Sequence, residues 1–421
     1  MRNGDRYARL RRRRHARRAR RKIGASRAVH RILRALFAPW LKWIFRPEVE
    51  NHELVQRLRP PYLIMPNHTS VWDPFLVNIF VPQIIHYVVS DANFRSKLVE
   101  FGLGLVGSIP KTKVMSDLDT VKNIMKVRNA RGVVGIFPEG QNTYDGHTLP
   151  IYYSTAKLAK VLRIPVVTAR IAGAFLSKPR WGKRVRKGRV RIRYDLTLTP
   201  EQLKKLSVEQ IDASIAGALE HDEYEYQRRH PQKFVGADRA EYAEVALFAC
   251  PQCSRFDTLH SHGNLLSCTR CGYTVRYDLY GFFQPHTGAL RFRTMREWNL
   301  WQIEELHRRL RLFVTEAPAE PLFREQEVVA EVGYRSMPLE PYRKGELTLY
   351  PDRMELTEGS QTDRFPIRQI AGINVQNQER LEFYVEDNLY RLTVPDPRGC
   401  TYKWDLAVRF MQRLAASSAV V

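Results

Sequence analysis

Short apolar runs alternate with longer segments of helical periodicity from about Tyr62 to Tyr194. The predicted strands are YLIM, IIHYVVS, VVGIF, IPVVTARI and VRIRYDLTL, and the helical segments between them include SDLDTVKNIMKVRNA and STAKLAKVLR. Strands and helices that alternate in this way are typical of α/β proteins with a mostly parallel sheet. We therefore expect an α/β core in this part of the chain.

A helical pattern of a different kind precedes this core. Apolar side chains recur at helical spacing from Val29 to Ile44, while basic residues fall on the opposite side. Tryptophan and phenylalanine on the apolar side are typical of a helix that lies in a membrane interface. We expect an amphipathic interfacial helix over residues 27–50, kinked at Pro39. The alternative is an ordinary helix packed on the α/β core.

The C-terminal part of the chain shows the alternating apolar and polar residues that are typical of β-strands, and it ends with one amphipathic helix. The strand segments are KGELTLYPDRMELTEG, RFPIRQIAGINVQ and RLEFYVEDNLYRLTV, and the helix is TYKWDLAVRFMQRL. This pattern predicts a small β-rich domain with a C-terminal helix over residues 336–421, after a helical linker over residues 286–335. By pattern alone the domain resembles pleckstrin-homology (PH) or GRAM-like modules.

Positive charge is concentrated at the N-terminus. The chain carries a formal net charge of +24, and residues 1–34 hold 15 Arg or Lys and one acid, which is more than half of the excess. We expect residues 1–26 to be a disordered Arg-rich tail, because they have almost nothing apolar to bury. No run of about 18 apolar residues and no signal peptide is present, so we expect the protein to stay in the cytoplasm.

Four of the five cysteines form two Cys-x-x-Cys pairs with a C-x2-C-x14-C-x2-C spacing. They are Cys250, Cys253, Cys268 and Cys271. This spacing is typical of two knuckles that share one tetrahedral zinc ion. Because all four ligands would be thiolates, the Zn²⁺ has no open position and is expected to be structural. We predict a zinc ribbon over residues 245–285.

The stretch PNHTSVWDPF places His68 and Asp73 five residues apart, just after the predicted strand YLIM. Parallel α/β sheets usually bind ligands at the carboxyl ends of their strands. Two further loops carry polar groups: GSIPKTK has two lysines, and VVGIFPEGQNTYDG has Glu139 just past another strand. A structural alternative is that His68 is a partly buried histidine and Asp73 only caps a helix.

These stretches together resemble the glycerolipid acyltransferases of the lysophosphatidic acid acyltransferase type. NHTSVWD matches the NHxxxxD block of that family, GSIPKTK its Gly-rich second block, FPEG its third and IPVV, Ile164 to Val167, its fourth. The blocks span roughly residues 60–195, within an acyltransferase domain expected over residues 51–240. The resemblance implies transfer of a fatty acyl group from an acyl-CoA or acyl carrier protein thioester to the hydroxyl of a lysophospholipid, by default 1-acylglycerol-3-phosphate.

The resemblance also implies roles for individual residues. His68 would be the general base and Asp73 would fix its tautomer, so no protein nucleophile is needed. Glu139, with Gly140 in the same FPEG block, would help to hold the glycerol portion of the acceptor. Asn142 stands where the family often has a phosphate-binding arginine. The residues left to bind the phosphate are Lys111, Lys113 and Arg170.

An enzyme that acts on lipids needs a membrane surface. We expect anionic lipids on the cytoplasmic face to attract the basic tail and the interfacial helix, as partners beside the lysophospholipid acceptor and the thioester donor. A different class of function is a nucleic-acid-binding protein that uses the Arg-rich arm and the zinc ribbon. It leaves the four blocks unexplained. A third hypothesis, an inactive lipid-binding relative, is disfavoured because His68, Asp73 and Glu139 are all present.

Overall fold

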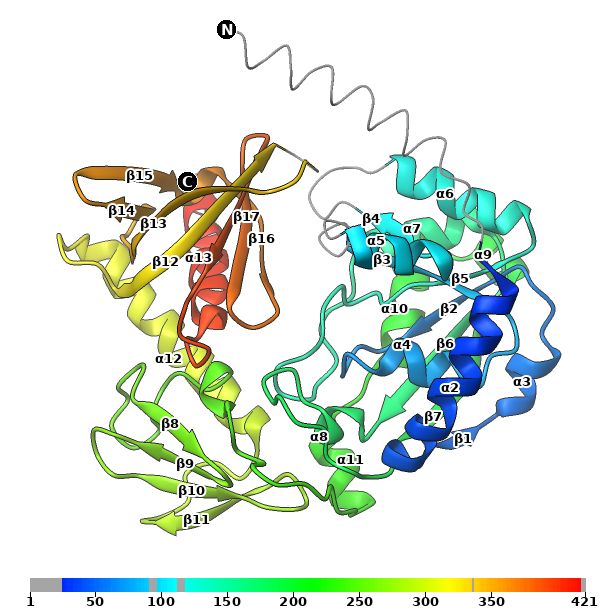
Figure 1. Ribbon diagram of the computed structural model, residues 1–421, viewed down its shortest axis with the longest axis horizontal. Coiled ribbons are helices and arrows are strands. Elements are labelled where there is room, and N and C mark those ends of the chain that lie inside the picture. The colour runs from blue at the N-terminus through cyan, green and yellow to red at the C-terminus, as the bar shows by residue number, and fades with distance from the viewer. Residues whose placement is uncertain (1–24, 91–96, 112–117, 335–336, 418–421) are drawn as a thin grey trace, which may run out of the picture. The chain divides into compact units, whose positions relative to one another are not determined.

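The computed structural model describes residues 25–90, 97–111, 118–334 and 337–417 (Figure 1). The predicted tail lies outside these ranges except for residues 25 and 26, and Lys113 also lies outside them. The chain divides into two compact units. The first comprises the described residues up to Asn142 together with Thr148–Ala174 and Arg189–His221, and the second comprises Thr143–His147, Phe175–Gly188 and the residues from Asp222 onward.

A seven-stranded sheet forms the centre of the first unit, in the order β1-β7-β6-β2-β5-β3-β4. Its neighbouring strands are parallel except for the pair β6 and β7. The expected α/β core with a mostly parallel sheet is therefore confirmed. The strands are β1 Glu48–Glu50, β2 Tyr62–Pro66, β3 Ile85–Ser90, β4 Ile109–Lys111, β5 Val133–Gly135, β6 Val166–Ala172 and β7 Arg191–Leu198.

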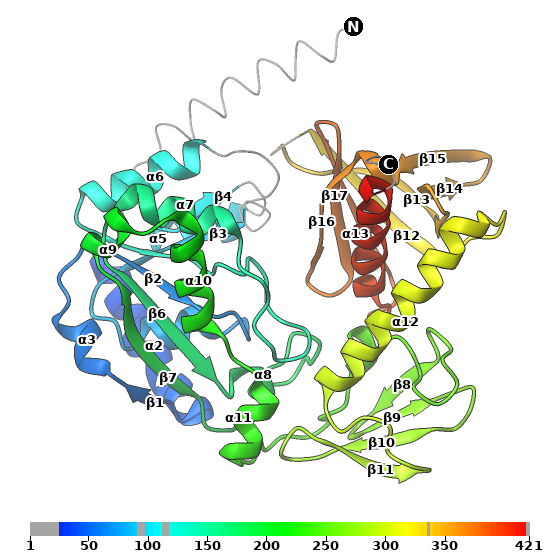
Figure 2. The same ribbon diagram turned by 180° about the vertical axis from the view of Figure 1, so that it is seen from behind.

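Helices cover both faces of this sheet. Helix α2 lies over one face in Figure 1, and α7 and α10 lie over the other in Figure 2. On the second of these faces, Leu63, Val134 and Val166 of the sheet share a buried cluster with apolar residues of the covering helices. The helices are α2 Arg27–Phe45, α3 His52–Arg57, α4 Asp73–Asn78, α5 Lys97–Leu105, α6 Leu118–Asn129, α7 Tyr153–Leu162, α9 Pro200–Lys205 and α10 Val208–Leu219.

Helix α2 is only partly buried, and Pro39 lies inside it. Its last apolar residues, Leu41, Ile44 and Phe45, are buried. A second set of large apolar side chains on the same helix is exposed, with Leu36 at 68%: Ile32, Leu33, Leu36, Phe37, Trp40 and Trp43. Within the described residues, no helix is both long enough and apolar enough to cross a membrane.

The second unit contains two antiparallel sheets. The four-stranded sheet has the order β11-β10-β9-β8, and the seven-stranded sheet has the order β15-β14-β13-β12-β18-β17-β16. Helix α13 packs on β16 and β17 of the larger sheet and against α12. The elements are α8 Ala174–Ser177, α11 Glu223–Arg229, η2 Ala243–Val245, β8 Leu259–His262, β9 Leu265–Cys268, β10 Thr274–Tyr277, β11 Phe283–Thr287, α12 Met295–Glu316, β12 Phe323–Tyr334, β13 Glu340–Leu349, β14 Arg353–Glu358, β15 Gln361–Pro366, η3 Ile367–Gln369, β16 Ile370–Gln376, β17 Arg380–Val385, β18 Asn388–Thr393 and α13 Thr401–Ser417.

Strand β12 differs from the sequence expectation. It occupies the middle of the larger sheet, although its residues fell within the predicted helical linker over residues 286–335. The reason is a shift in its pairing with β13 between Glu325 and Val328, where Glu327 has a φ of 59°. Such a β-bulge interrupts the alternation of inward and outward side chains, so the period of two is lost in the sequence. The predicted helix of this segment is present as α12.

Candidate active site

His68 lies directly after β2, at the carboxyl end of a strand that pairs with β5 on one side and β6 on the other. The preceding residue, Asn67, is fully buried and fixes this end of the strand. Its Nδ2 donates to the carbonyl of Ile171 at 3.0 Å, and its Oδ1 accepts from the Ile171 amide at 2.7 Å. The His68 backbone is thereby held at the edge where parallel sheets usually bind ligands.

The side chains of His68 and Asp73 meet, as the sequence hypothesis requires. His68 Nδ1 lies 3.0 Å from Asp73 Oδ2, and the exposed fraction of the His68 side chain is 17% while that of Asp73 is zero. The Asp73 carboxylate also accepts from the amides of Thr69 at 2.7 Å and Ser70 at 2.8 Å, and from the Thr69 hydroxyl. Asp73 is the first residue of α4 and closes the turn before it, so it is not the helix cap of the structural alternative.

Glu139 joins the first motif block to the third. Its Oε1 accepts from the His68 amide at 2.6 Å, and its Oε2 accepts from the Leu149 amide at 2.7 Å. The side chain is almost fully buried. Burial raises the pKa of Glu139 to about 8, although the two amide donors oppose this rise; the nearby Asp73 and Glu220 carboxylates add to it.

Asn142 lies against the imidazole. Its Nδ2 is 3.0 Å from His68 Nδ1, the same nitrogen that faces Asp73. An ionised carboxylate only accepts hydrogen bonds, so Nδ1 must carry the proton when it bonds to Asp73. With Nδ1 protonated, the lone pair of the neutral imidazole is on Nε2.

Of the other residues predicted to bind substrate, Gly140 and Lys111 lie near the same tyrosine ring, whereas Arg170 lies on β6. Gly140 has a φ of +73°, and a Cβ there would lie 2.5 Å from the Tyr152 ring, so only glycine fits. Lys111, at the end of β4, places Nζ 5.5 Å from the centre of the same ring. Arg170 is half-buried on β6, and its guanidinium makes no hydrogen bond or ion pair with the residues that the structure describes.

Two contributions to the site were missed in the sequence. The Phe137 ring stacks on the His68 imidazole with ring centres 4.1 Å apart, and Tyr87 stacks on Phe137 at 5.7 Å. Asn67 holds the backbone before His68. Phe137 is the first residue of the FPEG block and Asn67 is the first residue of the NHTSVWD block. Their position within these motif blocks was the sequence feature that could have indicated a role in the site.

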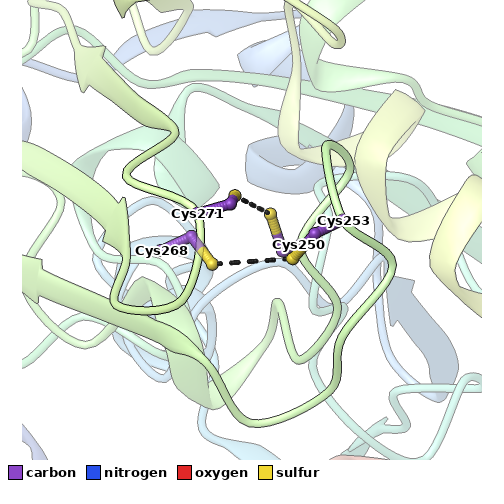
Figure 3. Close-up of side chains that lie close together, drawn as sticks. All are labelled: Cys250, Cys253, Cys268 and Cys271. Carbon is purple, nitrogen blue, oxygen red and sulfur yellow. Dashed lines mark hydrogen bonds between the residues drawn. The ribbon is translucent and has the colours of Figure 1, made fainter.

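The four cysteines come together in the second unit (Figure 3). Their Sγ atoms all lie within 4.8 Å of one another. Cys250 and Cys271 are 3.6 Å apart, and Cys253 and Cys268 are 3.8 Å apart. A tetrahedron with metal–sulfur bonds of about 2.3 Å has edges of about 3.8 Å, so the cluster matches the size of a metal site with four thiolate ligands.

The buried Glu139 carboxyl makes stability depend on pH. Because its pKa in the folded protein is raised to about 8 from an ordinary value near 4.5, the folded state holds a proton between these values that the unfolded state has lost. We expect the unfolding free energy to fall as pH rises through this window, by up to about 1.4 kcal/mol per pH unit. Glu139→Gln removes this slope, whatever its effect on absolute stability. Urea unfolding between pH 5 and 8 measures it, and parallel curves for the two proteins would contradict the expectation.

The first unit is similar to known acyltransferases in sequence and to one of them in structure. Residues 46–172 match the family model described as Acyltransferase. Among solved structures, a similar chain is the 1-acyl-sn-glycerophosphate (LPA) acyltransferase PlsC from Thermotoga maritima, with a TM-score of 0.41 and 16% sequence identity over 48% of this chain and 80% of that one. The matched residues contain His68, Asp73 and Glu139, so the family-model match supports an acyltransferase domain in this part of the chain.

Proposed function

We propose that this protein transfers a fatty acyl group from an acyl thioester to the free hydroxyl of a lysophospholipid, with 1-acylglycerol-3-phosphate as the acceptor. The observation that carries the proposal is the hydrogen bond between His68 Nδ1 and Asp73 Oδ2 in the segment that matches the acyltransferase model. The thioester is that of coenzyme A or of acyl carrier protein.

The reaction needs a base and no protein nucleophile. His68 Nε2 takes the proton of the acceptor hydroxyl while the oxygen attacks the thioester carbonyl carbon. The tetrahedral intermediate collapses, the carbon–sulfur bond breaks, and the imidazolium returns its proton to the leaving thiolate. Asp73 acts on this cycle in two ways: it keeps the proton of the neutral imidazole on Nδ1, and its charge stabilises the imidazolium.

The acceptor phosphate requires cationic groups near the FPEG loop. Lys111 Nζ lies 5.5 Å from the centre of the Tyr152 ring, and a Cβ on Gly140 would meet the same ring at 2.5 Å, so the ammonium is near the FPEG loop. We assign phosphate binding to Lys111, with Lys113 and Arg170 as further candidates. Asn142 lies against the imidazole at the position where the family often has arginine, so here it acts on His68 beside Asp73. Glu139 would hold the acceptor glycerol only through lone pairs that the two backbone amides leave free.

Removing the imidazole tests the catalytic role. A positioned base contributes about 10² to 10⁴ in rate, so we expect His68→Ala to lower kcat by that factor without unfolding the protein. His52→Ala is the matched control, since His52 lies on α3 and bonds to the Phe80 carbonyl. Products are followed by mass with a panel of lyso-acceptors and both donor types. Undiminished turnover by His68→Ala would refute the assignment.

The exposed apolar surface of α2 supports docking of the first unit on a membrane. Trp40 contacts Trp72 with ring centres 5.0 Å apart, and Trp72 contacts Phe75 at 5.6 Å. Val71 and Phe75 are also exposed, so the apolar surface continues from α2 to the turn that carries His68 and Asp73. A lipid surface at this position would bring the lysophospholipid acceptor close to the candidate base, His68. We propose peripheral binding to the cytoplasmic face, with anionic lipids attracting the basic residues.

Leu36→Glu tests the membrane surface. Burying one leucine side chain contributes roughly 1.5 to 3 kcal/mol, so its replacement by a charged residue is expected to weaken vesicle binding about tenfold or more. Val161→Glu on α7 is the control, because Val161 is similarly exposed at 63%, against 68% for Leu36. Co-sedimentation with vesicles that contain anionic lipids measures the effect. Equal binding by the two variants would contradict this surface.

The spacing and geometry of the four cysteines support a structural zinc ion. All four ligands are sulfur, which favours Zn²⁺ and leaves no open position for water or substrate. We therefore propose that residues 245–285 form a zinc ribbon. The larger sheet and α13 keep the pattern that resembles PH or GRAM-like modules. We propose that identity for the predicted residues 336–421 together with β12, Phe323–Tyr334, on the basis of the antiparallel sheet closed by a helix.

Metal analysis tests the zinc proposal. The purified protein is expected to carry about one zinc per chain, and Cys271→Ser is expected to lose it. Cys400→Ser is the matched control, because Cys400 lies outside the cluster and its Sγ donates to the Val245 carbonyl at 3.1 Å, a bond that serine can keep. Zinc-free wild-type protein, or zinc retained at full occupancy in Cys271→Ser, would refute the assignment.

The nucleic-acid-binding alternative receives less support. The family-model match lies in the part of the chain that this alternative leaves unexplained. Most of the Arg-rich arm lies outside the described residues. Removal of residues 1–26 separates the two functions: loss of vesicle binding with retained activity favours the membrane role, whereas loss of a steeply salt-dependent RNA affinity favours the alternative.

A further inference from the structure

The loop that carries Glu139 passes from the first unit into the second and back. After Asn142 the chain belongs to the second unit at Thr143–His147, and at Thr148 it returns to the first. The Leu149 amide then donates to Glu139 Oε2 at 2.7 Å. The other oxygen of Glu139, Oε1, accepts from the His68 amide. Glu139 is therefore connected to both ends of this excursion: to its start through the backbone, and to its end through the hydrogen bond from Leu149.

The excursion is held firmly by the second unit. Thr143, Tyr144 and Asp145 are all buried. The Tyr144 ring stacks on Tyr402 of α13 with ring centres 3.8 Å apart, and the Arg180 guanidinium lies 4.1 Å from the centre of the Tyr144 ring.

The Asp145 carboxylate is the polar anchor of the excursion. Its Oδ1 accepts from the Thr143 hydroxyl at 3.0 Å and from the His147 amide at 3.2 Å. Its Oδ2 accepts from Asn299 Nδ2 of α12 at 2.9 Å. An aromatic stack and a buried hydrogen bond thus attach a loop of five residues to two helices of the second unit.

Helix α12 also reaches the cysteine cluster. Gln302 Nε2 donates to Asn299 Oδ1 at 2.9 Å, and Gln302 Oε1 accepts from the Phe248 amide at 2.8 Å and from the Ala249 amide at 3.3 Å. Trp298 Nε1 donates to the Ala249 carbonyl at 2.9 Å. Ala249 immediately precedes Cys250, so hydrogen bonds through Gln302 and Asn299 connect the backbone next to the first metal-ligand candidate to Asp145.

We propose that Tyr144, Asp145 and Asn299 are positioning residues: by anchoring the excursion, the second unit fixes the Glu139 side chain, which in turn holds the His68 backbone. Metal bound at the four cysteines supports the same chain of contacts through Gln302, so its removal loosens the loop. The proposal rests on the proposed acyl transfer for its kinetic consequence. Its structural consequence, the order of the loop, stands without it.

Asn299→Leu tests this role, with Leu356→Ala as the matched control. Leu356 is a fully buried residue of β14, so its truncation destabilises the same unit without touching the excursion. A misplaced catalytic group costs up to about a hundredfold, so we expect Asn299→Leu to lower kcat by about tenfold to a hundredfold, and the control to keep it. Hydrogen exchange of the Leu149 amide is expected to accelerate in Asn299→Leu and in the chelated wild type, and to stay slow in the control.

A second pair of variants guards against misfolding of Asn299→Leu. Tyr144 Oη is buried without a hydrogen-bond partner among the described residues, so Tyr144→Phe keeps the stack on Tyr402 and loses nothing. Tyr144→Leu removes the stack. We expect fast Leu149 exchange and reduced kcat in Tyr144→Leu, and restoration of both in Tyr144→Phe.

The outcomes separate the two proposals. Unchanged Leu149 exchange and unchanged kcat in both Asn299→Leu and Tyr144→Leu would overturn the positioning role. A wild-type protein that transfers no acyl group but shows the expected exchange pattern would refute the proposed function and support the positioning role. If chelation lowers kcat by the same factor in Asn299→Leu as in the wild type, the two effects are independent. The metal would then not act through the hydrogen bond between Asn299 and Asp145.

Discussion

The Asp73 carboxylate is the group on which the candidate site depends, because the turn and the base share it. It accepts two backbone amides and one hydroxyl within its own turn, and it also faces the imidazole. A buried donor left without its acceptor costs about 1 to 3 kcal/mol, so the turn from Thr69 to Asp73 would not keep this shape around a different side chain. The orientation of His68 therefore follows from the same contacts that fold the turn.

Glu139 extends this arrangement to a second block, because it bonds to the backbone on both sides and brings the loop after β5 to the turn after β2. Two motif blocks far apart in the sequence become one site because their strands are neighbours in the sheet. The loop after Glu139 then enters the second unit, while the exposed apolar residues of α2 continue to Val71 and Phe75 beside the same turn. The loop that carries Glu139 is thus continuous in sequence with the second unit, and the turn that carries His68 is continuous with the proposed membrane surface.

Much of the fold could be predicted because its signals are local. The five strand runs of the α/β core, the helix at α12 and the meeting of His68 with Asp73 follow from periodicity and from motif blocks. Strand β12 was missed because a bulge interrupts its alternation. The contacts of Asn142 with His68 and of Asp145 with Asn299 were missed for a different reason: they join residues 74 and 154 positions apart, and no pattern within one segment encodes such a pair.

Whether His68 can act as a base depends on the tautomer of its neutral imidazole, which can be measured. Nitrogen NMR of the full-length protein, with His68 assigned by comparison with His68→Ala, reports which ring nitrogen carries the proton when the imidazole is neutral. We predict a proton on Nδ1, directed at Asp73, and a free lone pair on Nε2. A neutral imidazole with its proton on Nε2 would contradict it, because no lone pair would then be available to the acceptor hydroxyl.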